Sequence, residues 1–209
     1  MSSIISTFIP EIIIGKNYND YMENIFPTLP VIADNKLSMI DQSIIHADEG
    51  GYWLEFGVHS GETITHTAGR KLGVPNLTIH GFDSFEGLPE DWLQPETGHT
   101  NLKGHFDLEG KIPQNLLCVH NINIIKGWFD KSLPKFIKEN DINKISFLNI
   151  DSDLYSSANT VLTLLTPYFK GHCVIYFDEF CNYPGGKNGE YKAFSEFLHN
   201  NKDNIEKCI

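Results

Sequence analysis

The chain has 209 residues, of which 41% are hydrophobic and 21% are charged, the proportions of an ordinary single globular domain. Sixteen Lys and Arg residues against 27 Asp and Glu residues give a formal net charge of −11. This excess of negative charge argues against general binding to nucleic acid or to an anionic membrane, so we expect a small-molecule partner and neither a nucleic-acid nor a membrane partner.

Cysteine usage and the N-terminal segment both favour the cytoplasm. The four cysteines form no Cys-x-x-Cys pair, which is typical of reduced thiols in a cytosolic protein; they are Cys118, Cys173, Cys181 and Cys208. Residues 3–15 are rich in isoleucine, but a proline and an acidic residue interrupt the run and no basic residue precedes it. We therefore expect a cytoplasmic protein with neither a secretion signal nor a membrane span.

The first 50 residues differ in pattern from the rest of the chain. Leu37, Ile40 and Ile44 recur at helical spacing within residues 36–48, after a region broken by prolines. We expect a helix packed on the core, with a cover over a ligand site or a subunit contact in a homo-oligomer as alternatives. The pattern divides the chain into an N-terminal accessory region, 1–50, and a main domain, 51–209.

From residue 51 the pattern alternates between strands and helices. The expected strands are 52–57, 78–83, 121–126, 144–150 and 172–177, and the expected helices lie near 62–72, 130–140, 156–168 and 190–200. Strands separated by helices predict an α/β fold, with a mostly parallel sheet covered by helices on both faces. In such sheets ligands bind at the carboxyl ends of the strands, near the point where the strand order reverses.

A glycine-containing turn from Leu54 to Thr63 follows the first strand. Gly57 and Gly61 would let the backbone approach a ligand closely, and the helix behind them presents free N–H groups, which suits a nucleotide-like or carboxylate-bearing ligand. The spacing differs from the Gly-x-Gly-x-x-Gly of dinucleotide-binding folds, and a purely structural turn is the alternative.

Acidic residues stand at four of the five strand ends. Glu55, Asp83, Asp151 and the pair Asp178 and Glu179 should meet at one edge of the sheet. Any single one could be a helix cap. Together they would repel one another unless hydrogen-bond donors or a cation compensate.

Two roles follow for these residues. Asp83 comes about 20 residues after the turn, the spacing at which an acidic side chain accepts hydrogen bonds from ribose hydroxyls. Asp151, Asp178 and Glu179 offer hard oxygen ligands with no Cys or His interleaved, a set that suits Mg²⁺, Mn²⁺ or Ca²⁺ and accommodates Fe²⁺. The alternative is that Asp151 caps the following helix and Asp178 accepts loop amides.

Two loops could complete a pocket. Residues 86–113 are rich in glycine and proline and too long for a plain connection, which is typical of a lid or binding loop. His99 and His105 within it are candidate catalytic bases or substrate contacts, with an ordinary surface role as the alternative. After the third strand, Gly127 allows close approach, and the two aromatic residues behind it could lie against a planar base or belong to the core.

Four segments of the main domain form a recognisable series. They are Gly81-Phe82-Asp83-Ser84-Phe85-Glu86-Gly87-Leu88-Pro89-Glu90-Asp91-Trp92; Gly127-Trp128-Phe129 with Leu133-Pro134; Ile150-Asp151-Ser152-Asp153-Leu154-Tyr155-Ser156-Ser157; and Phe177-Asp178-Glu179-Phe180 with Tyr183-Pro184-Gly185. In this order they resemble the S-adenosylmethionine-dependent methyltransferases of the macrocin O-methyltransferase (TylF) type. The resemblance runs through most of residues 51–200 and is far more specific than the glycine turn alone.

The resemblance implies the class I methyltransferase fold, a Rossmann-like sandwich, with S-adenosyl-L-methionine as cofactor. The turn would hold the methionine part, with Glu55 at its amino group, and Asp83 would hold the ribose. In the relatives, acidic residues at the positions of Asp151, Asp178 and Glu179 bind a divalent metal, commonly Mg²⁺, and known members methylate sugar hydroxyls. The implied cofactor-binding residues are Glu55, Phe56, Gly57, Val58, Ser60, Gly61, Thr63, Asp83, Ser84, Phe85, Gly127, Trp128, Phe129 and Asp151.

Two departures from the family pattern stand out. Glu179 occupies a position that is Asp in the best-described members, which lengthens one metal ligand by a methylene. The antiparallel seventh strand usual in this fold is expected to be missing, because the chain is truncated or because a partner completes the sheet edge.

These inferences combine into one mechanism. We expect in-line transfer of a methyl group from S-adenosylmethionine to a hydroxyl of a sugar or a sugar-containing small molecule, such as a glycoside or a nucleotide sugar. Asp151 is the first candidate for the base, with His99, His105 or Asp153 behind it. The alternatives are a non-catalytic cofactor-binding or scaffold protein of the same fold, and a nicotinamide-dependent oxidoreductase, which should show the absent three-glycine turn.

Overall fold

Six strands form the central sheet of the computed structural model, which describes residues 4–5, 35–94, 98–180 and 185–202. The strand order is β1-β8-β7-β2-β3-β6, and every neighbouring pair is parallel. The strands are β1 (Ile4–Ile5), β2 (Tyr52–Phe56), β3 (Ile79–Asp83), β6 (Ile122–Lys126), β7 (Ile145–Ile150) and β8 (Val174–Phe177). The predicted α/β sandwich with a parallel sheet is confirmed.

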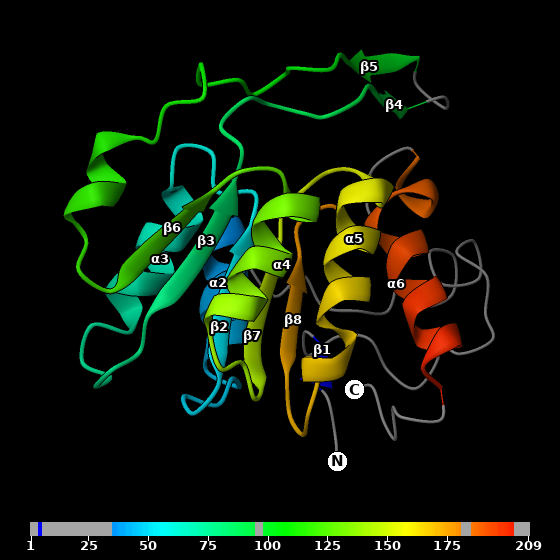
Figure 1. Ribbon diagram of the computed structural model, residues 1–209. Coiled ribbons are helices and arrows are strands. Elements are labelled where there is room, and N and C mark those ends of the chain that lie inside the picture. Colours follow the sequence, from blue (N-terminus) through cyan, green and yellow to red (C-terminus); the bar gives the residue numbers. More distant parts are fainter. Residues whose placement is uncertain (1–3, 6–34, 95–97, 181–184, 203–209) are drawn as a thin grey trace.

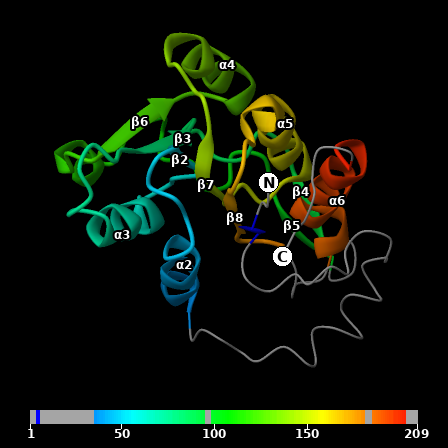
Figure 2. The ribbon, with the colours of Figure 1, turned by 90° about the horizontal axis from the view of Figure 1, so that it is seen from below.

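Helices cover both faces of this sheet (Figure 2). Because side chains alternate along a strand, Trp53 of β2 packs toward the helices on one face and Leu54 toward those on the other. All six residues of β7 are buried, as expected for a strand covered on both sides. The first face carries α2 (Lys36–Ile44) and α3 (Glu62–Arg70), and the second carries α4 (Phe129–Glu139), α5 (Tyr155–Leu165) and α6 (Glu190–Asn200).

The N-terminal helix α2 packs on the same core as the rest of the chain. Its Ile40 and Ile44 are buried against the cluster that contains Trp53 and Phe147, which satisfies the apolar spacing seen in the sequence. The proposed boundary at residue 50 stays a prediction. The prolines of the region before α2 lie outside the described residues.

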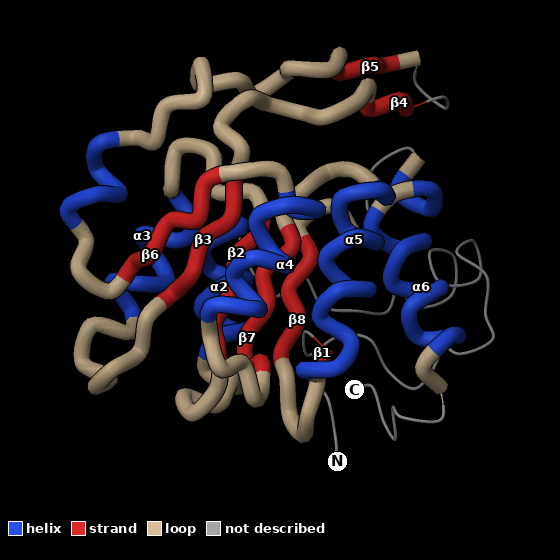
Figure 3. The backbone as a smooth tube through the Cα atoms, viewed as in Figure 1, coloured by secondary structure: helices blue, strands red, loops and turns tan. Residues whose placement is uncertain are grey.

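The long segment after β3 contains a hairpin. The strands β4 (Trp92–Gln94) and β5 (His99–Asn101) pair in antiparallel fashion and stand apart from the sheet, beyond the carboxyl ends of its strands (Figure 1). Long irregular stretches join them to the body (Figure 3). The remaining elements are the short 3-10 helices η2 (Gln114–Cys118), η3 (Thr166–Tyr168) and η4 (Gly186–Asn188).

The strand order reverses between β2 and β7, the two central strands. Ligands of such sheets bind outside this point, at the carboxyl ends. The edge beside β8, where a missing strand or a partner was expected, is formed by β1 of the same chain. Among the helices that the structure describes, none combines the length and apolar character that crossing a membrane requires.

Candidate active site

A cavity of about 620 Å³ opens at the carboxyl ends of the central strands. Its wall is built from the turn after β2, the end of β3, the start of α4 and the loops after β7 and β8. The structure therefore brings distant sequence segments together where the strand order reverses. The predicted site residues that line it are Gly57, Val58, Ser60, Thr63, Asp83, Ser84, Trp128, Phe129, Asp151, Asp178 and Glu179.

Gly57 joins the two central strand ends. Its φ of 92° lies in the left-handed region, and a Cβ atom added to it would lie 1.7 Å from the carbonyl oxygen of Asp151. The backbone of Asp151 in turn donates from its N–H to the carbonyl of Phe56 at 2.9 Å. The turn after β2 and the loop after β7 are thus packed backbone to backbone, which requires glycine.

Asp83 holds this turn in place. Its Oδ2 accepts hydrogen bonds from the N–H groups of Val58 at 2.8 Å and His59 at 2.7 Å, and its Oδ1 accepts from that of Phe85 at 2.7 Å. These turn amides already have an acceptor, so a ligand carboxylate would instead meet the N-terminus of α3, where Ser60 before the helix and Thr63 in its first turn line the cavity. Contact of Asp83 with a ribose stays a prediction.

Glu55 lies behind the turn, outside the cavity lining. Its side chain is 1% exposed, and its Oε2 accepts a hydrogen bond from Asn149 Nδ2 at 3.0 Å. Burial raises the pKa of this carboxyl to about 8, although the bond from Asn149 lowers it. The expected contact between Glu55 and the amino group of a cofactor therefore has no support from the geometry.

Four other predicted cofactor-binding residues lie behind the residues that line the cavity. Phe56 and Phe85 are buried in the two core clusters. Gly61 begins α3 with a φ of 86°, where a Cβ atom would lie 2.2 Å from Leu116 Cδ2. Gly127, with a φ of 139°, donates from its N–H to the carbonyl of Asp83 at 2.8 Å.

Both aromatic residues after β6 reach the cavity. Trp128 is the N-cap of α4 and lines the cavity together with Phe129. The ring of Phe129 also packs edge-on against Phe56, with centroids 5.2 Å apart. Phe129 therefore lines the cavity and also packs in the core. The sequence offered these two roles as alternatives, and Phe129 has both.

The two histidines chosen from the sequence lie in the hairpin segment. His99 belongs to β5, and the exposed His105 packs against Phe106 with ring centroids 4.2 Å apart, outside the cavity lining. A different histidine, His59, lines the cavity and faces Phe106 at 5.8 Å. The sequence alone does not identify His59 as a site residue. It stands between the turn glycines, and no motif specifies the residue type at that position.

The acidic residues after β7 and β8 meet at the other end of the cavity. Asp151, Asp178 and Glu179 each place one carboxylate oxygen within 4.8 Å of the other two. Burial, followed by the charge of Asp178, raises the pKa of Asp151 to about 7. Burial, followed by Glu190 and Asp178, raises the pKa of Glu179 to about 11. Such shifts are expected where carboxylates crowd together away from water.

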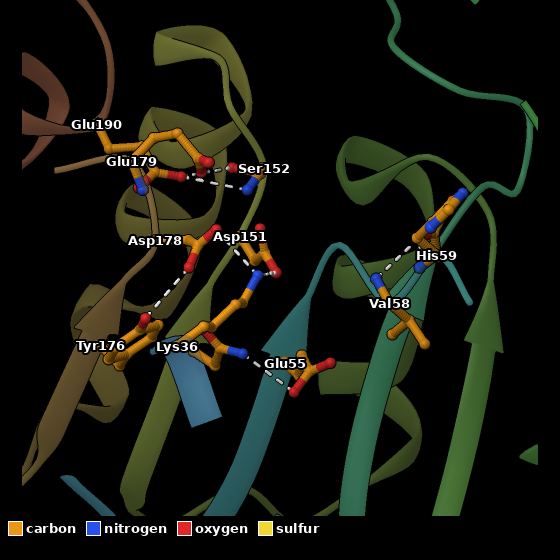
Figure 4. A network of polar contacts seen from close by, with 12 residues as sticks. Lys36, Glu55, Val58, His59, Asp151, Ser152, Tyr176, Asp178, Glu179 and Glu190 are labelled. Carbon is orange, nitrogen blue, oxygen red and sulfur yellow. Dashed lines mark hydrogen bonds and ion pairs between the residues drawn. The ribbon is translucent and has the colours of Figure 1, made fainter. Parts of the chain in front are cut away.

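Lys36 lies among these carboxylates (Figure 4). Its Nζ donates to Asp151 Oδ2 at 2.6 Å and to Asp178 Oδ2 at 2.9 Å. Burial opposes its charge, but the two carboxylates raise its pKa above the usual value. Sequence reasoning missed this residue, which comes 115 positions before Asp151 and belongs to the first turn of α2.

Glu190 supports the acidic loops from behind. Fully buried at the start of α6, it accepts hydrogen bonds from the N–H of Ser152 at 3.1 Å and from that of Glu179 at 3.2 Å, one on each carboxylate oxygen. Burial raises its pKa well above the usual value. This residue too was missed, because its contacts depend on how α6 packs and not on a local motif.

Asp151, Asp178 and Glu179, which we call the acidic group, fit a divalent cation. Its donors are three carboxylates from two neighbouring strand ends, the ligand type that Mg²⁺ and Mn²⁺ prefer. Within the described part of the chain, Glu179 Oε2 is buried without a hydrogen-bond partner, so it has an unmet need for a positive charge or a donor.

Comparison with known proteins identifies the family. The family model described as macrocin-O-methyltransferase (TylF) matches residues 33–206. The chain belongs to this family. It is therefore an O-methyltransferase, and membership in the TylF family sets aside the oxidoreductase alternative. No curated protein matches the chain at a significant level.

Three solved structures of methyltransferases share the fold. The calicheamicin methyltransferase CalS11 superposes with a TM-score of 0.63 at 22% identity, over 90% of this chain and 80% of its own. An apo structure of CalS11, a TDP-rhamnose 3′-O-methyltransferase, gives 0.55 at 20% identity over 90% and 81%. The O-methyltransferase NovP gives 0.58 at 21% identity over 82% and 73%.

Proposed function

We propose that this TylF-family enzyme transfers a methyl group from S-adenosyl-L-methionine to a hydroxyl of a sugar or sugar-containing small molecule, with a divalent metal at the acidic group. The single observation that carries the proposal is the shared cavity. One end is the glycine turn with Asp83, the other end is the group of Asp151, Asp178 and Glu179, and both line the same space.

The turn end suits the cofactor. The first turn of α3 offers N–H groups and a partial positive charge to a carboxylate. Asp83 lines the cavity and keeps lone pairs beyond the three amides it binds, so it can also accept from a ribose. Trp128 and Phe129 offer aromatic surface to a planar base. Bound S-adenosylmethionine would supply the reactive methyl group.

The acidic end suits the acceptor. Asp151 is the proposed base, because its carboxylate lies in the cavity beside the other two acidic residues. Asp151, Asp178 and Glu179 would hold a divalent metal, which lowers the pKa of a coordinated hydroxyl and fixes its direction. On α5, Ser156, Ser157 and Thr160 line the same region with hydroxyl groups that can bind a polyhydroxylated ligand.

The acceptor class draws support from the structural relatives. CalS11 acts on a nucleotide-linked rhamnose by its description, and this chain covers 81% of the length of that protein. We extend the class of sugar acceptor, and neither the particular sugar nor the position, to this chain. We keep the cytoplasm, expected from the cysteine usage, as the proposed location of the reaction.

The test is methylation of a panel of acceptors. The protein would be incubated with S-adenosylmethionine, Mg²⁺ or Mn²⁺, and nucleotide sugars and glycosides, with mass spectrometry to detect the gain of one methyl group. Parallel reactions with EDTA test the metal separately. Calorimetry with S-adenosylhomocysteine and with NAD tests the cofactor without needing the acceptor, and failure to bind S-adenosylhomocysteine would contradict the proposal.

A further inference from the structure

Lys36 binds two of the three carboxylates that would hold a metal ion. Its ammonium group touches Oδ2 of both Asp151 and Asp178, and these two residues belong to the group of three that could hold an ion. A divalent cation binds carboxylate oxygens at about 2.0–2.6 Å. A metal bound to those two carboxylates would lie near Nζ, where two positive charges in a partly buried site repel strongly.

We propose that Lys36 is a tethered counter-ion that occupies the acidic site in the metal-free protein and is displaced when a divalent cation binds. This inference rests on the proposed function, because it takes Asp151, Asp178 and Glu179 as the metal ligands.

The position of Lys36 allows this exchange. Its side chain is 32% exposed, so the ammonium group can move toward water while its aliphatic stem stays on the protein. The residue begins α2, whose N-cap Asn35 accepts a hydrogen bond from the N–H of Ser38 at 3.0 Å and so keeps the helix start in place. The exchange thus requires a rotation of one side chain and leaves the sheet unchanged.

The exchange makes the lysine and the metal antagonists. Without metal, Lys36 neutralises part of the negative charge of Asp151 and Asp178, and it stabilises the folded site. With metal, the same lysine must leave, so its charge weakens metal binding. Removing Lys36 should therefore lower stability in the absence of metal and raise affinity for the metal.

The experiment compares Lys36→Met with the full wild-type chain, using Mn²⁺ alone as the probe. Free Mn²⁺ would be measured by electron paramagnetic resonance during a titration, and thermal unfolding would be followed in EDTA and in excess Mn²⁺. We expect Lys36→Met to bind Mn²⁺ at least about ten-fold more tightly. We also expect it to melt below the wild type in EDTA and to gain more from Mn²⁺.

Two variants make this test specific. Lys144→Met removes the same charge from a lysine of similar exposure, 27% against 32%, whose partner Asp48 is not part of the acidic group, and it should bind Mn²⁺ as the wild type does. Asp178→Asn should abolish the measured binding in every background. Lys36→Gln repeats the measurement with a polar side chain if Lys36→Met fails to fold.

Each remaining outcome overturns the inference in a distinguishable way. Equal or weaker Mn²⁺ binding by Lys36→Met, with loss of binding in Asp178→Asn, would leave the metal site intact and refute the antagonism. Absence of any Mn²⁺ binding that depends on Asp178 would refute the metal assignment, and with it this inference, while binding of S-adenosylhomocysteine would still stand.

Discussion

The two ends of the cavity are stabilised by opposite means. At the turn end, the carboxylate of Asp83 is held by three backbone N–H groups, so its charge is satisfied by fixed dipoles. At the acidic end, Asp151 and Asp178 share the ammonium group of Lys36, and burial raises the pKa of Glu179 to about 11. If both ends act as proposed, the first would bind its ligand as it stands, whereas the second would have to release Lys36 before it binds a metal ion.

The largest effect is expected where the two ends touch. Gly57→Ala places a methyl group against the carbonyl of Asp151 and forces an L-residue to a φ of 92°, so it should disturb both ends together. We expect a loss of at least about 3 kcal/mol in the free energy of unfolding. Binding of S-adenosylhomocysteine and methyl transfer should both be lost.

Urea unfolding and calorimetry would measure these losses, with Gly69→Ala as the matched control. Gly69 lies inside α3 with open space at the Cβ position, so alanine should be neutral or stabilise by up to about 1 kcal/mol. A Gly57→Ala protein as stable as the wild type would show that the two strand ends are not packed as described.

A change confined to the acidic end should separate the two functions. Asp151→Asn removes the proposed base but keeps the backbone contact with Gly57. Methyl transfer should fall by about 10²–10⁴-fold, while affinity for S-adenosylhomocysteine should stay within about three-fold, because the turn end is untouched. Steady-state rates and calorimetry measure the two quantities.

Asp130→Asn is the control for this change. Asp130 also lines the cavity but lies in the first turn of α4, outside the acidic group. It should retain most of the wild-type rate. Substantial turnover by Asp151→Asn would remove Asp151 from the mechanism.

A smaller effect is expected from a change in Glu190, whose carboxylate holds the two loops that carry the acidic group. Glu190→Gln keeps the size of the side chain but replaces one of two accepting oxygens by an NH₂ group, so the N–H of Ser152 or of Glu179 loses its acceptor. This should cost about 1–3 kcal/mol of stability. Mn²⁺ affinity should fall about ten-fold because the ligand loops are less well held.

Glu196→Gln on the same helix provides the comparison. Its carboxylate accepts from Tyr155 away from the site and is 45% exposed, so Mn²⁺ affinity should not change. If Mn²⁺ affinity does not change in Glu190→Gln, Glu190 stabilises the fold but does not position the metal ligands.

The sequence predicted the backbone elements around the site better than the side chains that contact one another within it. Apolar periodicity and glycine placement located the strands, the turn and the acidic strand ends, because each is a local pattern tied to one backbone conformation. Lys36 and Glu190 were missed because their contacts cross 115 and 38 residues of sequence and depend on how α2 and α6 pack. Their charges become meaningful only beside the carboxylates that the fold brings to them.

The other site residues named from the sequence divided into those that reach the cavity and those that do not. Those fixed by the turn geometry, such as Val58, Ser60 and Thr63, reach the cavity. Glu55 does not, because strand alternation turns it into the interior, and His105 does not, because its side chain is exposed outside the cavity although the next residue, Phe106, lines it. Sequence position identifies a neighbourhood, but the direction of a side chain follows from packing.

The smallest expected effect on ligand binding tests the interior position of Glu55. Burial raises its folded-state pKa to about 8 from 4.5, so between these values the unfolded chain releases a proton that the folded chain keeps, and stability falls as pH rises. Glu55→Gln removes this loss and still accepts from Asn149. We expect Glu55→Gln to be more stable than the wild type at pH 8, by up to about 4 kcal/mol, and to differ much less from it at pH 5, in urea unfolding.

Exposed Glu139, at the end of α4, supplies the control, and Glu139→Gln should leave the pH dependence unchanged. Cofactor affinity decides between the two accounts of Glu55. If the carboxylate lies behind the turn, Glu55→Gln changes stability and leaves S-adenosylhomocysteine binding nearly unaltered, so the turn end needs only Asp83. A large loss of affinity without a change in pH dependence would instead place Glu55 at the amino group of the cofactor, as the family resemblance implied, and the turn end would then hold a second ligand-binding charge.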